Sequence, residues 1–150
     1  MAANLKARAS ITIDSPRDRV WRALVDPNMI REYMFGADVR TSWEVGRPIT
    51  WKGEMNGIAF EDKGVVLKFD TPKTLQFSHF SPLSRQPDLP ENYHIITIDL
   101  AEADGETRVT LTQNRNETEE ARQHSEQNWN LMLEGLKDVV ENASSNRPSG

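Results

Sequence analysis

Hydrophobic residues near the C-terminus recur at the spacing of an α-helix. Over Glu117 to Ala143, apolar side chains share one face and polar side chains take the other. The apolar face carries Trp129, Met132, Leu133, Leu136, Val139 and Val140. Spacings of three and four residues are typical of a helix that lies on a hydrophobic core. At ~1.5 Å per residue this helix would be roughly 40 Å long and could cross a small domain.

The same helix face changes character upstream of Trp129. It carries only small or polar residues there, namely Thr118, Ala121, Arg122 and Ser125. A tightly packed interface would need larger apolar groups. We therefore expect the helix to pack closely at its C-terminal end and to roof a hollow at its N-terminal end.

The first part of the chain predicts one strand and two short helices. Arg8 to Ile13 alternates between apolar and polar residues, as a half-buried strand does. Ser15 is the expected N-cap of a helix whose first position is Pro16. Asp26-Pro27 interrupts that helix and begins a second one, which ends at Gly36.

The middle of the chain alternates as antiparallel strands do. The predicted strands are Ile49 to Lys52, Ile58 to Phe69, Thr74 to Phe80, Tyr93 to Leu100 and Thr107 to Asn114. Asn56-Gly57 and Asp104-Gly105 are typical of hairpin turns, and Gly64 indicates a bulge or twist point. Three prolines make Ser81 to Asn92 a stiff loop. This order predicts an α+β domain over residues 5–142, with a curved antiparallel sheet of six or seven strands around the long helix. Residues 143–150 are an expected flexible tail.

The composition of the chain argues against several classes of function. The chain of 150 residues is 37% hydrophobic and 27% charged, which is ordinary for a globular protein. No apolar run approaches the ~18 residues of a membrane span, and the absence of cysteine excludes disulfides and cysteine-based zinc sites. A net charge of −5 with interspersed signs argues against nucleic-acid binding. We expect a cytoplasmic location.

The sequence offers little support for catalysis. The three histidines, His79, His94 and His124, are not spaced as a metal-binding pair. His79 and His94 each alternate with apolar residues and should point from the sheet to the interior, as core or rim residues or as ligand contacts. Glu61-Asp62 are adjacent in a strand and face opposite ways, so we expect a loop-end or solvated pair and not a pair for acid–base catalysis. No nucleophile elbow, phosphate loop or dinucleotide fingerprint occurs. We expect no catalytic residue, metal or cofactor.

Aromatic residues give the stronger signal for a binding site. They are expected between the sheet and the long helix, together with small and polar residues that could contact a ligand. The candidates are Trp51, Phe60, Phe77, His79, Tyr93, Gln113, Ala121, Ser125 and Trp129. Trp51 and Trp129 could equally be plain core residues. Leu131 lies opposite the core face and could mark a dimer or partner contact.

Four segments of the sequence resemble a known superfamily. "ITIDSPRDRVWRALVDPNMIREYMFG" is similar to the opening of the START-related superfamily, also called SRPBCC, whose type fold is the birch pollen allergen. Similarity to the activators of the heat-shock-protein-90 ATPase is carried by "FEDKGVVLKFDTPKTLQFSHFSP", "HIITIDLAEADGETRVTLTQ" and "NWNLMLEGLKDVVEN". The resemblance implies a helix-grip fold, with two short helices after the first strand, in a stand-alone domain of the bacterial type.

Three functions follow from these observations. The first is binding of a small hydrophobic or amphipathic ligand in a cavity between the sheet and the C-terminal helix. The second, implied by the resemblance, is a protein-interaction role in stress response, as an activator of a chaperone ATPase. The third is an enzyme of the cyclase or hydrolase type that the same fold sometimes hosts. An enzyme would need a polar cluster inside the cavity, which the sequence pattern does not indicate.

Overall fold

A single curved sheet and one long helix dominate the computed structural model, which describes residues 5–34, 36–55, 57–82, 86–116 and 118–145. The sheet there has seven antiparallel strands in the order β1-β7-β6-β5-β4-β3-β2. They are β1 (Leu5–Ile13), β2 (Asp38–Thr41), β3 (Pro48–Met55), β4 (Ile58–Asp70), β5 (Thr74–His79), β6 (His94–Ala103) and β7 (Glu106–Asn116). The helices are α1 (Arg17–Val25), α2 (Pro27–Tyr33) and α3 (Glu119–Ser145), and a 3-10 turn, η2 (Pro90–Asn92), precedes β6.

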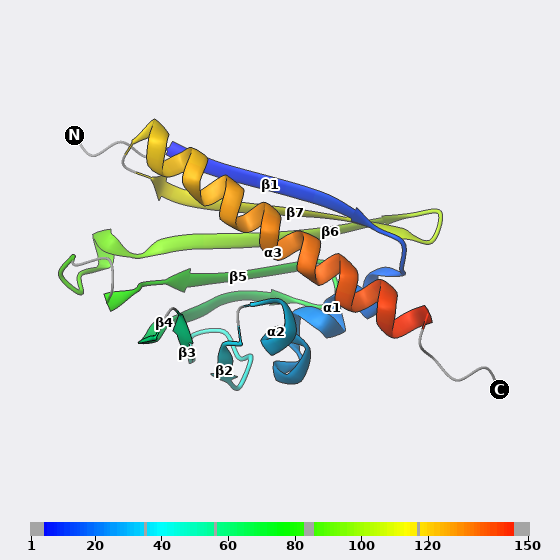
Figure 1. Cartoon of the computed structure of the whole chain (residues 1–150), viewed down its shortest axis with the longest axis horizontal. Helices are drawn as coiled ribbons and strands as arrows, with labels where there is room; N and C mark the ends of the chain where they lie inside the picture. Colours follow the sequence, from blue (N-terminus) through cyan, green and yellow to red (C-terminus); the bar gives the residue numbers. More distant parts are fainter. Residues whose placement is uncertain (1–4, 35, 56, 83–85, 117, 146–150) are drawn as a thin grey trace.

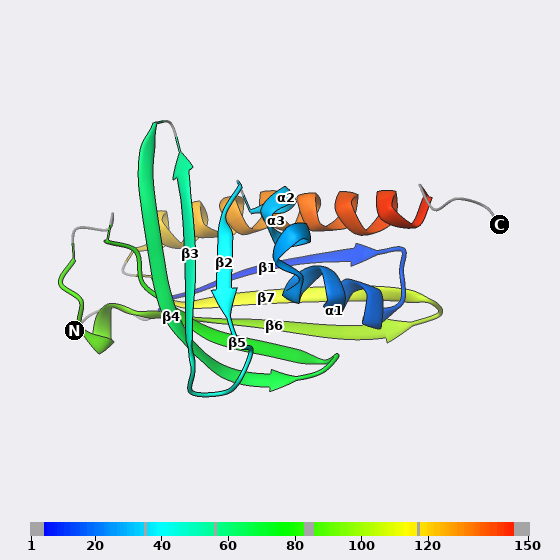
Figure 2. The same ribbon diagram turned by 90° about the horizontal axis from the view of Figure 1, so that it is seen from below.

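Helix α3 lies on one face of the sheet, and the sheet curves around it. It runs obliquely past β1 and β7, and its second half reaches the level of α1 and α2 (Figure 1). In the perpendicular view, β3 and β4 turn sharply away from the direction of β6 and β7 (Figure 2). The predicted α+β helix-grip fold, with two short helices after the first strand, is confirmed.

The C-terminal half of α3 is the tightly packed end, as the pattern predicted. Leu133 and Leu136 are fully buried in the core cluster that also holds the inward side chains of β6 and β7. Polar contacts fix the same end to β1 and the turn after it. The Lys137 ammonium donates to the Thr12 carbonyl oxygen at 2.9 Å, and the Glu141 carboxylate accepts from the Asp14 N–H at 2.9 Å. This half of the helix is therefore held by packing and by hydrogen bonds.

The predicted N-cap of α1 is wrong. The helix begins at Arg17, and its N-cap residue is Pro16, which provides no side-chain cap. Ser15 is buried, and its hydroxyl has no hydrogen-bond partner within the described ranges. Its carbonyl oxygen instead accepts from the buried Thr107 hydroxyl at 2.7 Å, so the turn is tied to β7. A tertiary contact has taken precedence over the local capping pattern.

The other sequence predictions differ from the structure mainly at the ends of elements. Asp26 does cap α2, because its side chain accepts from the Asn28 N–H at 2.9 Å. Strand β2 was not predicted, and α3 continues to Ser145, into the expected tail. The predicted helix start at Glu117, Asn56 of the first hairpin turn and residues 146–150 lie outside the described residues. None of the described helices combines the length and apolar character that crossing a membrane requires.

Tyr33 leads to a prediction about alkaline stability. Its hydroxyl is buried and donates to the Ala23 carbonyl oxygen at 2.8 Å. Burial, and secondarily the charge of Asp26, raises the pKa of Tyr33. The unfolded chain releases this proton near pH ~10 and the folded chain keeps it, so the stability it contributes is present below that pH and lost above it. The expected loss is ~1.4 kcal/mol per pH unit above pH ~10.

Tyr33→Phe should flatten this alkaline loss, because phenylalanine has no proton to release. At neutral pH the variant should be less stable by about 1 kcal/mol, the usual net value of one hydrogen bond. Urea denaturation of both proteins between neutral pH and pH ~11 measures the two effects. Parallel stability curves would show that Tyr33 does not govern alkaline unfolding.

Candidate functional site

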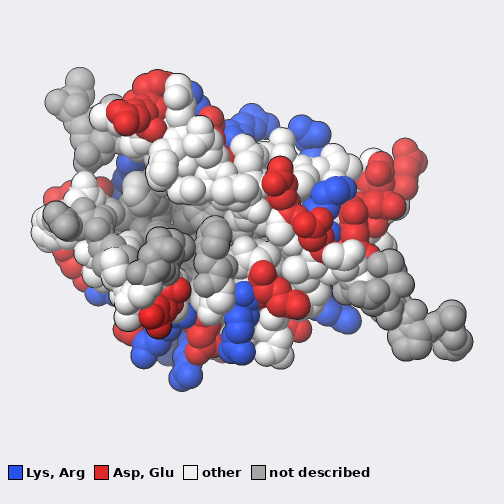
Figure 3. Space-filling view, in the orientation of Figure 1, with Lys and Arg blue, Asp and Glu red and all other residues white. Residues whose placement is uncertain are grey.

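A cavity of about 550 Å³ lies beneath the first half of α3. Its walls come from α3, from β3, β4, β5 and β7, and from the segment after α2. The lining residues are Met34, Ala37, Trp51, Phe60, Asp62, Phe77, His79, Ser81, Gln113, His124, Ser125, Asn128, Trp129, Leu131 and Met132. In the space-filling view, uncharged side chains lie beside a depression next to α3, and charged side chains lie farther from it (Figure 3).

The structure brings seven of the nine candidate residues to this cavity. They are Trp51, Phe60, Phe77, His79, Gln113, Ser125 and Trp129. Their role in binding a ligand remains a prediction. Tyr93 lies elsewhere, stacked on Phe80 at a ring-centroid distance of 5.1 Å and donating to Asp88 Oδ1 at 2.5 Å.

Ala121 is the other residue that does not reach the cavity. It is exposed, and it lines a neighbouring, more polar pocket of about 280 Å³. The two spaces share Gln113, His124 and Ser125. Ala121 is one helical turn before Ser125, where the facing end of β7 carries the polar Arg115 and Asn116. The apolar hollow therefore ends near Ser125.

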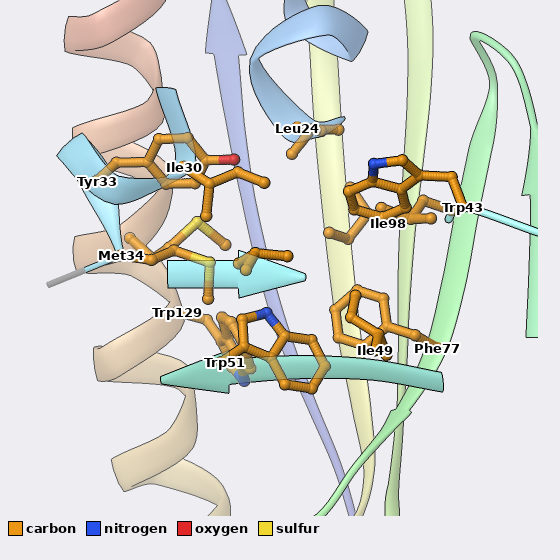
Figure 4. Close-up of a pocket in the computed structure, with 13 residues that line it drawn as sticks. Leu24, Ile30, Tyr33, Met34, Trp43, Ile49, Trp51, Phe77, Ile98 and Trp129 are labelled. Atoms are coloured by element: carbon orange, nitrogen blue, oxygen red, sulfur yellow. The ribbon is translucent and has the colours of Figure 1, made fainter. Parts of the chain in front are cut away.

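Aromatic rings form the inner wall of the cavity. The Trp51 ring lies 5.2 Å from the Phe77 ring and 5.1 Å from the His79 ring, centroid to centroid. Behind Trp51 and Trp129 the packing closes to a residual space of only about 30 Å³, lined by groups such as Leu24, Ile30 and Ile98 (Figure 4). Both predictions for Trp51 and Trp129, as core residues and as cavity residues, therefore fit the structure, since the two side chains border the core on one side and the cavity on the other.

A polar network fixes Trp129 and the α3 side of the cavity. The Trp129 indole N–H donates to Gln113 Oε1 at 2.5 Å, and the Ser125 hydroxyl donates to Asn116 Oδ1 at 2.9 Å. The Asn116 amide in turn donates to the carbonyl oxygens of Leu5 at 2.9 Å and Gln113 at 3.1 Å. These bonds tie α3 to β7 and β1. Gln113, Ser125 and Trp129 border the cavity, and Asn116 lines the neighbouring pocket.

Asp62 and His79 form a polar pair in the cavity wall that the sequence analysis missed. His79 Nε2 lies 2.9 Å from Asp62 Oδ2, and the two side chains are 26% and 17% exposed. The prediction that Glu61 and Asp62 face opposite ways is correct, but Asp62 is not solvated. Glu61 points outward to Lys52 at 3.3 Å. The available signal was Trp51, which pairs with Asp62 and so shares its face.

The other two histidines lie at the polar end of the site. His94 Nδ1 is 2.9 Å from the Asn114 carbonyl oxygen, and its ring lines the neighbouring polar pocket. His124 is exposed on α3 and borders both spaces. Across the described ranges, no three His, Asp or Glu side chains are grouped to hold a metal ion.

The proline-rich loop is anchored at the rim of the site. Lys63 on β4 forms an ion pair with Asp88, and this contact, followed by the Tyr93 hydroxyl, holds the pKa of Asp88 below its usual value. The Arg115 guanidinium donates to the carbonyl oxygens of Pro90 at 2.7 Å and Tyr93 at 2.9 Å. Ser81, at the start of the loop, lines the cavity, whereas residues 83–85 lie outside the described ranges.

Comparison with protein families assigns the chain. Residues 14–141 match the family described as activator of Hsp90 ATPase homolog 1-like protein. The chain belongs to this family. The match confirms the resemblance carried by the four sequence segments. Comparison with curated proteins gives no match.

Solved structures share the helix-grip fold of this chain. Protein ChR145 from Cytophaga hutchinsonii is 51% identical over 97% of this chain and 99% of its own, with a TM-score of 0.82. The Aha1 dimer from Colwellia psychrerythraea is 23% identical over 91% and 96% of the two chains, with a TM-score of 0.71. Ara h 8.0201 is 10% identical over 93% and 99%, with a TM-score of 0.73. The last two likenesses establish the shared fold alone.

Trp129→Phe should show how far the polar network stabilises this member of the family. The variant keeps an aromatic ring and removes the N–H that Gln113 Oε1 accepts. Gln113 is buried, and an unsatisfied buried acceptor costs ~1–3 kcal/mol. Urea denaturation should show a loss in that range. Adding Gln113→Leu should recover part of it, and two additive losses would contradict the coupling.

Proposed function

We propose that the protein binds a small hydrophobic or amphipathic molecule in the cavity beneath α3. The observation that supports this proposal is the volume of the cavity together with the chemistry of the side chains that line it. Ligand pockets typically enclose ~300–1,000 Å³, with mostly apolar walls and a few placed polar groups. Here about 550 Å³ is bordered by four aromatic side chains, the Asp62–His79 pair, Gln113 and Ser125.

The cost of the cavity supports the same proposal. Protein interiors are close-packed, and empty apolar space lowers stability because its lining side chains lose their contacts. On α3, the small Ser125 and the polar His124 and Asn128 border the cavity and leave this space open. A space of this size beside the well-packed core is explained by a ligand that occupies it.

Native mass spectrometry of freshly purified protein, followed by titration with the apolar dye Nile red, tests the proposal. A bound ligand should appear as an added mass that is lost on denaturation. The emptied protein should then bind Nile red with an increase in fluorescence, and the released ligand should displace the dye. Protein with no added mass and no dye response would contradict the proposal.

The family match favours a second candidate, in which the protein activates a chaperone ATPase. The family description names an activator of the Hsp90 ATPase, and the Colwellia psychrerythraea relative is described as a dimer. Leu131 is 59% exposed at the edge of the cavity and offers an apolar contact for a partner. In this case an Hsp90-type chaperone should be retained on the immobilised protein and its ATP turnover should rise. Leu131→Glu should then abolish the activation.

A further inference from the structure

We propose that the Asp62–His79 pair recognises a hydrogen-bond donor on the ligand, so that the cavity selects a ring-shaped apolar molecule with a hydroxyl or N–H group. This inference rests on the proposed function and adds the class of ligand. The pair joins two neighbouring strands, β4 and β5, and both side chains line the cavity. His79 also packs edge-on against the Trp51 ring, which limits its rotation.

The hydrogen bond between the two side chains determines what His79 offers. A carboxylate has no proton to donate, so His79 Nε2 carries the hydrogen that Asp62 Oδ2 accepts. In the neutral ring the other nitrogen, Nδ1, then has a free lone pair and accepts hydrogen bonds. The ring borders the cavity with Nε2 committed to Asp62, and Nδ1 is the nitrogen left for a ligand. Asp62 is a positioning residue that fixes the tautomer and the orientation of His79.

The arrangement costs stability, which indicates that it serves a purpose. Asp62 Oδ1 is shielded from solvent and has no hydrogen-bond partner among the residues that the structure describes. A buried polar atom without a partner is unfavourable, and such atoms in native proteins call for an explanation. Holding the His79 acceptor beside the Trp51 and Phe77 rings provides that explanation. Trp51 and Phe77 beside His79 favour a flat, aromatic body for the ligand.

A matched pair of probes tests the selection. β-Naphthol and its methyl ether share the fused rings and the oxygen, but only the naphthol donates a hydrogen bond. The wild type should bind the naphthol roughly three- to tenfold more tightly, the ratio that one net hydrogen bond gives. His79→Phe keeps a ring against Trp51 and removes the acceptor. In this variant the preference should fall to about one while the affinity for the ether is retained.

His94→Phe is the matched control. His94 is the register partner of His79 on β6, but it lines the neighbouring pocket and not the cavity. This variant should keep the full preference for the naphthol. Should His79→Phe fail to fold because Asp62 is left unpaired, the double variant Asp62→Leu/His79→Phe removes both polar groups and makes the same prediction.

Asp62→Asn tests positioning separately from packing. Imidazole ¹⁵N chemical shifts should show His79 protonated on Nε2 in the wild type and a mixture of tautomers in the variant, with a reduced naphthol preference. Equal binding of both probes by the wild type, or an unchanged preference in His79→Phe, would overturn the inference and leave the ligand-binding proposal standing. Binding of neither probe, together with no response to Nile red, would remove the proposed function and this inference with it.

Discussion

Replacing Gly64 with alanine is expected to destabilise the protein by about 3 kcal/mol or more, because overpacking against backbone leaves little room for relief. A Cβ at Gly64 would lie 1.7 Å from the Ser78 carbonyl oxygen and 2.5 Å from the Ser78 carbonyl carbon. These atoms belong to the β5 backbone and cannot rotate away. The two strands would have to separate, which weakens the paired backbone hydrogen bonds between Lys63 and Phe80 at 3.0 and 2.7 Å. Urea denaturation measures the loss.

Gly53→Ala is the matched control for this prediction. Its added Cβ would also meet atoms at 2.7 and 2.9 Å, but these are the end of the Phe60 ring, a side chain that can move. The expected cost is below about 1.5 kcal/mol. A comparable loss in both variants would show that the close approach of β4 and β5 is not special. A small loss at Gly64 would show that the two backbones can part easily.

Gly64 also illustrates what local sequence can and cannot predict. A glycine in a strand indicates a bulge, a twist or a close backbone approach, and the sequence analysis expected one of the first two. The irregular register falls between Val66 and Lys68, whereas Gly64 marks the close approach to Ser78. The difference depends on which backbone passes nearby, and that is set by the pairing of the sheet, not by neighbouring residues.

The periodic segments could be predicted because their pattern lies in the local sequence and does not depend on which strand pairs with which. In α3 and in the long hairpin strands, a buried apolar residue recurs every few positions. Many residues therefore indicate the same element. Strand β2 has only four residues at the edge of the sheet, too few for alternation to be distinctive. Ser15 matches a local capping rule, but its hydroxyl caps nothing among the described residues, and its carbonyl oxygen accepts from Thr107, far along the chain.

For the candidate site, the sequence predicted which side chains point inward better than it predicted how far the cavity extends along each strand or helix. Alternation correctly turned Trp51, Phe77 and His79 inward, because it fixes the face of the sheet to which a side chain belongs. It does not fix how far along a strand or helix the cavity extends, and so Tyr93 and Ala121 were included although they lie beyond it. The role of Asp62 is not evident from its chain neighbour Glu61, which faces the other way. Its structural neighbours are Trp51 and His79, across the sheet.

Ser125→Leu is expected to weaken Nile red binding by at least about tenfold while changing stability little. Ser125 is half-buried on α3 and lines the cavity. A leucine there would occupy space that the dye needs, and forcing both into one volume costs ~1–3 kcal/mol, of which ~1.4 kcal/mol is tenfold in affinity. The hydroxyl that donates to Asn116 is lost, at about 1 kcal/mol. Newly buried apolar surface offsets part of that loss, at roughly 25 cal/mol per Å².

Ala121→Leu provides the control, because it adds an equally large side chain one turn earlier on the same helix. Ala121 is exposed and borders the polar pocket, so this variant should bind Nile red as the wild type does. The comparison separates occupation of the cavity from a general effect of bulk on α3. Weaker binding together with a stability loss well above 1 kcal/mol in Ser125→Leu would indicate a damaged core. Unchanged dye binding in that variant would place the ligand elsewhere, and equal weakening by Ala121→Leu would place it in the polar pocket instead.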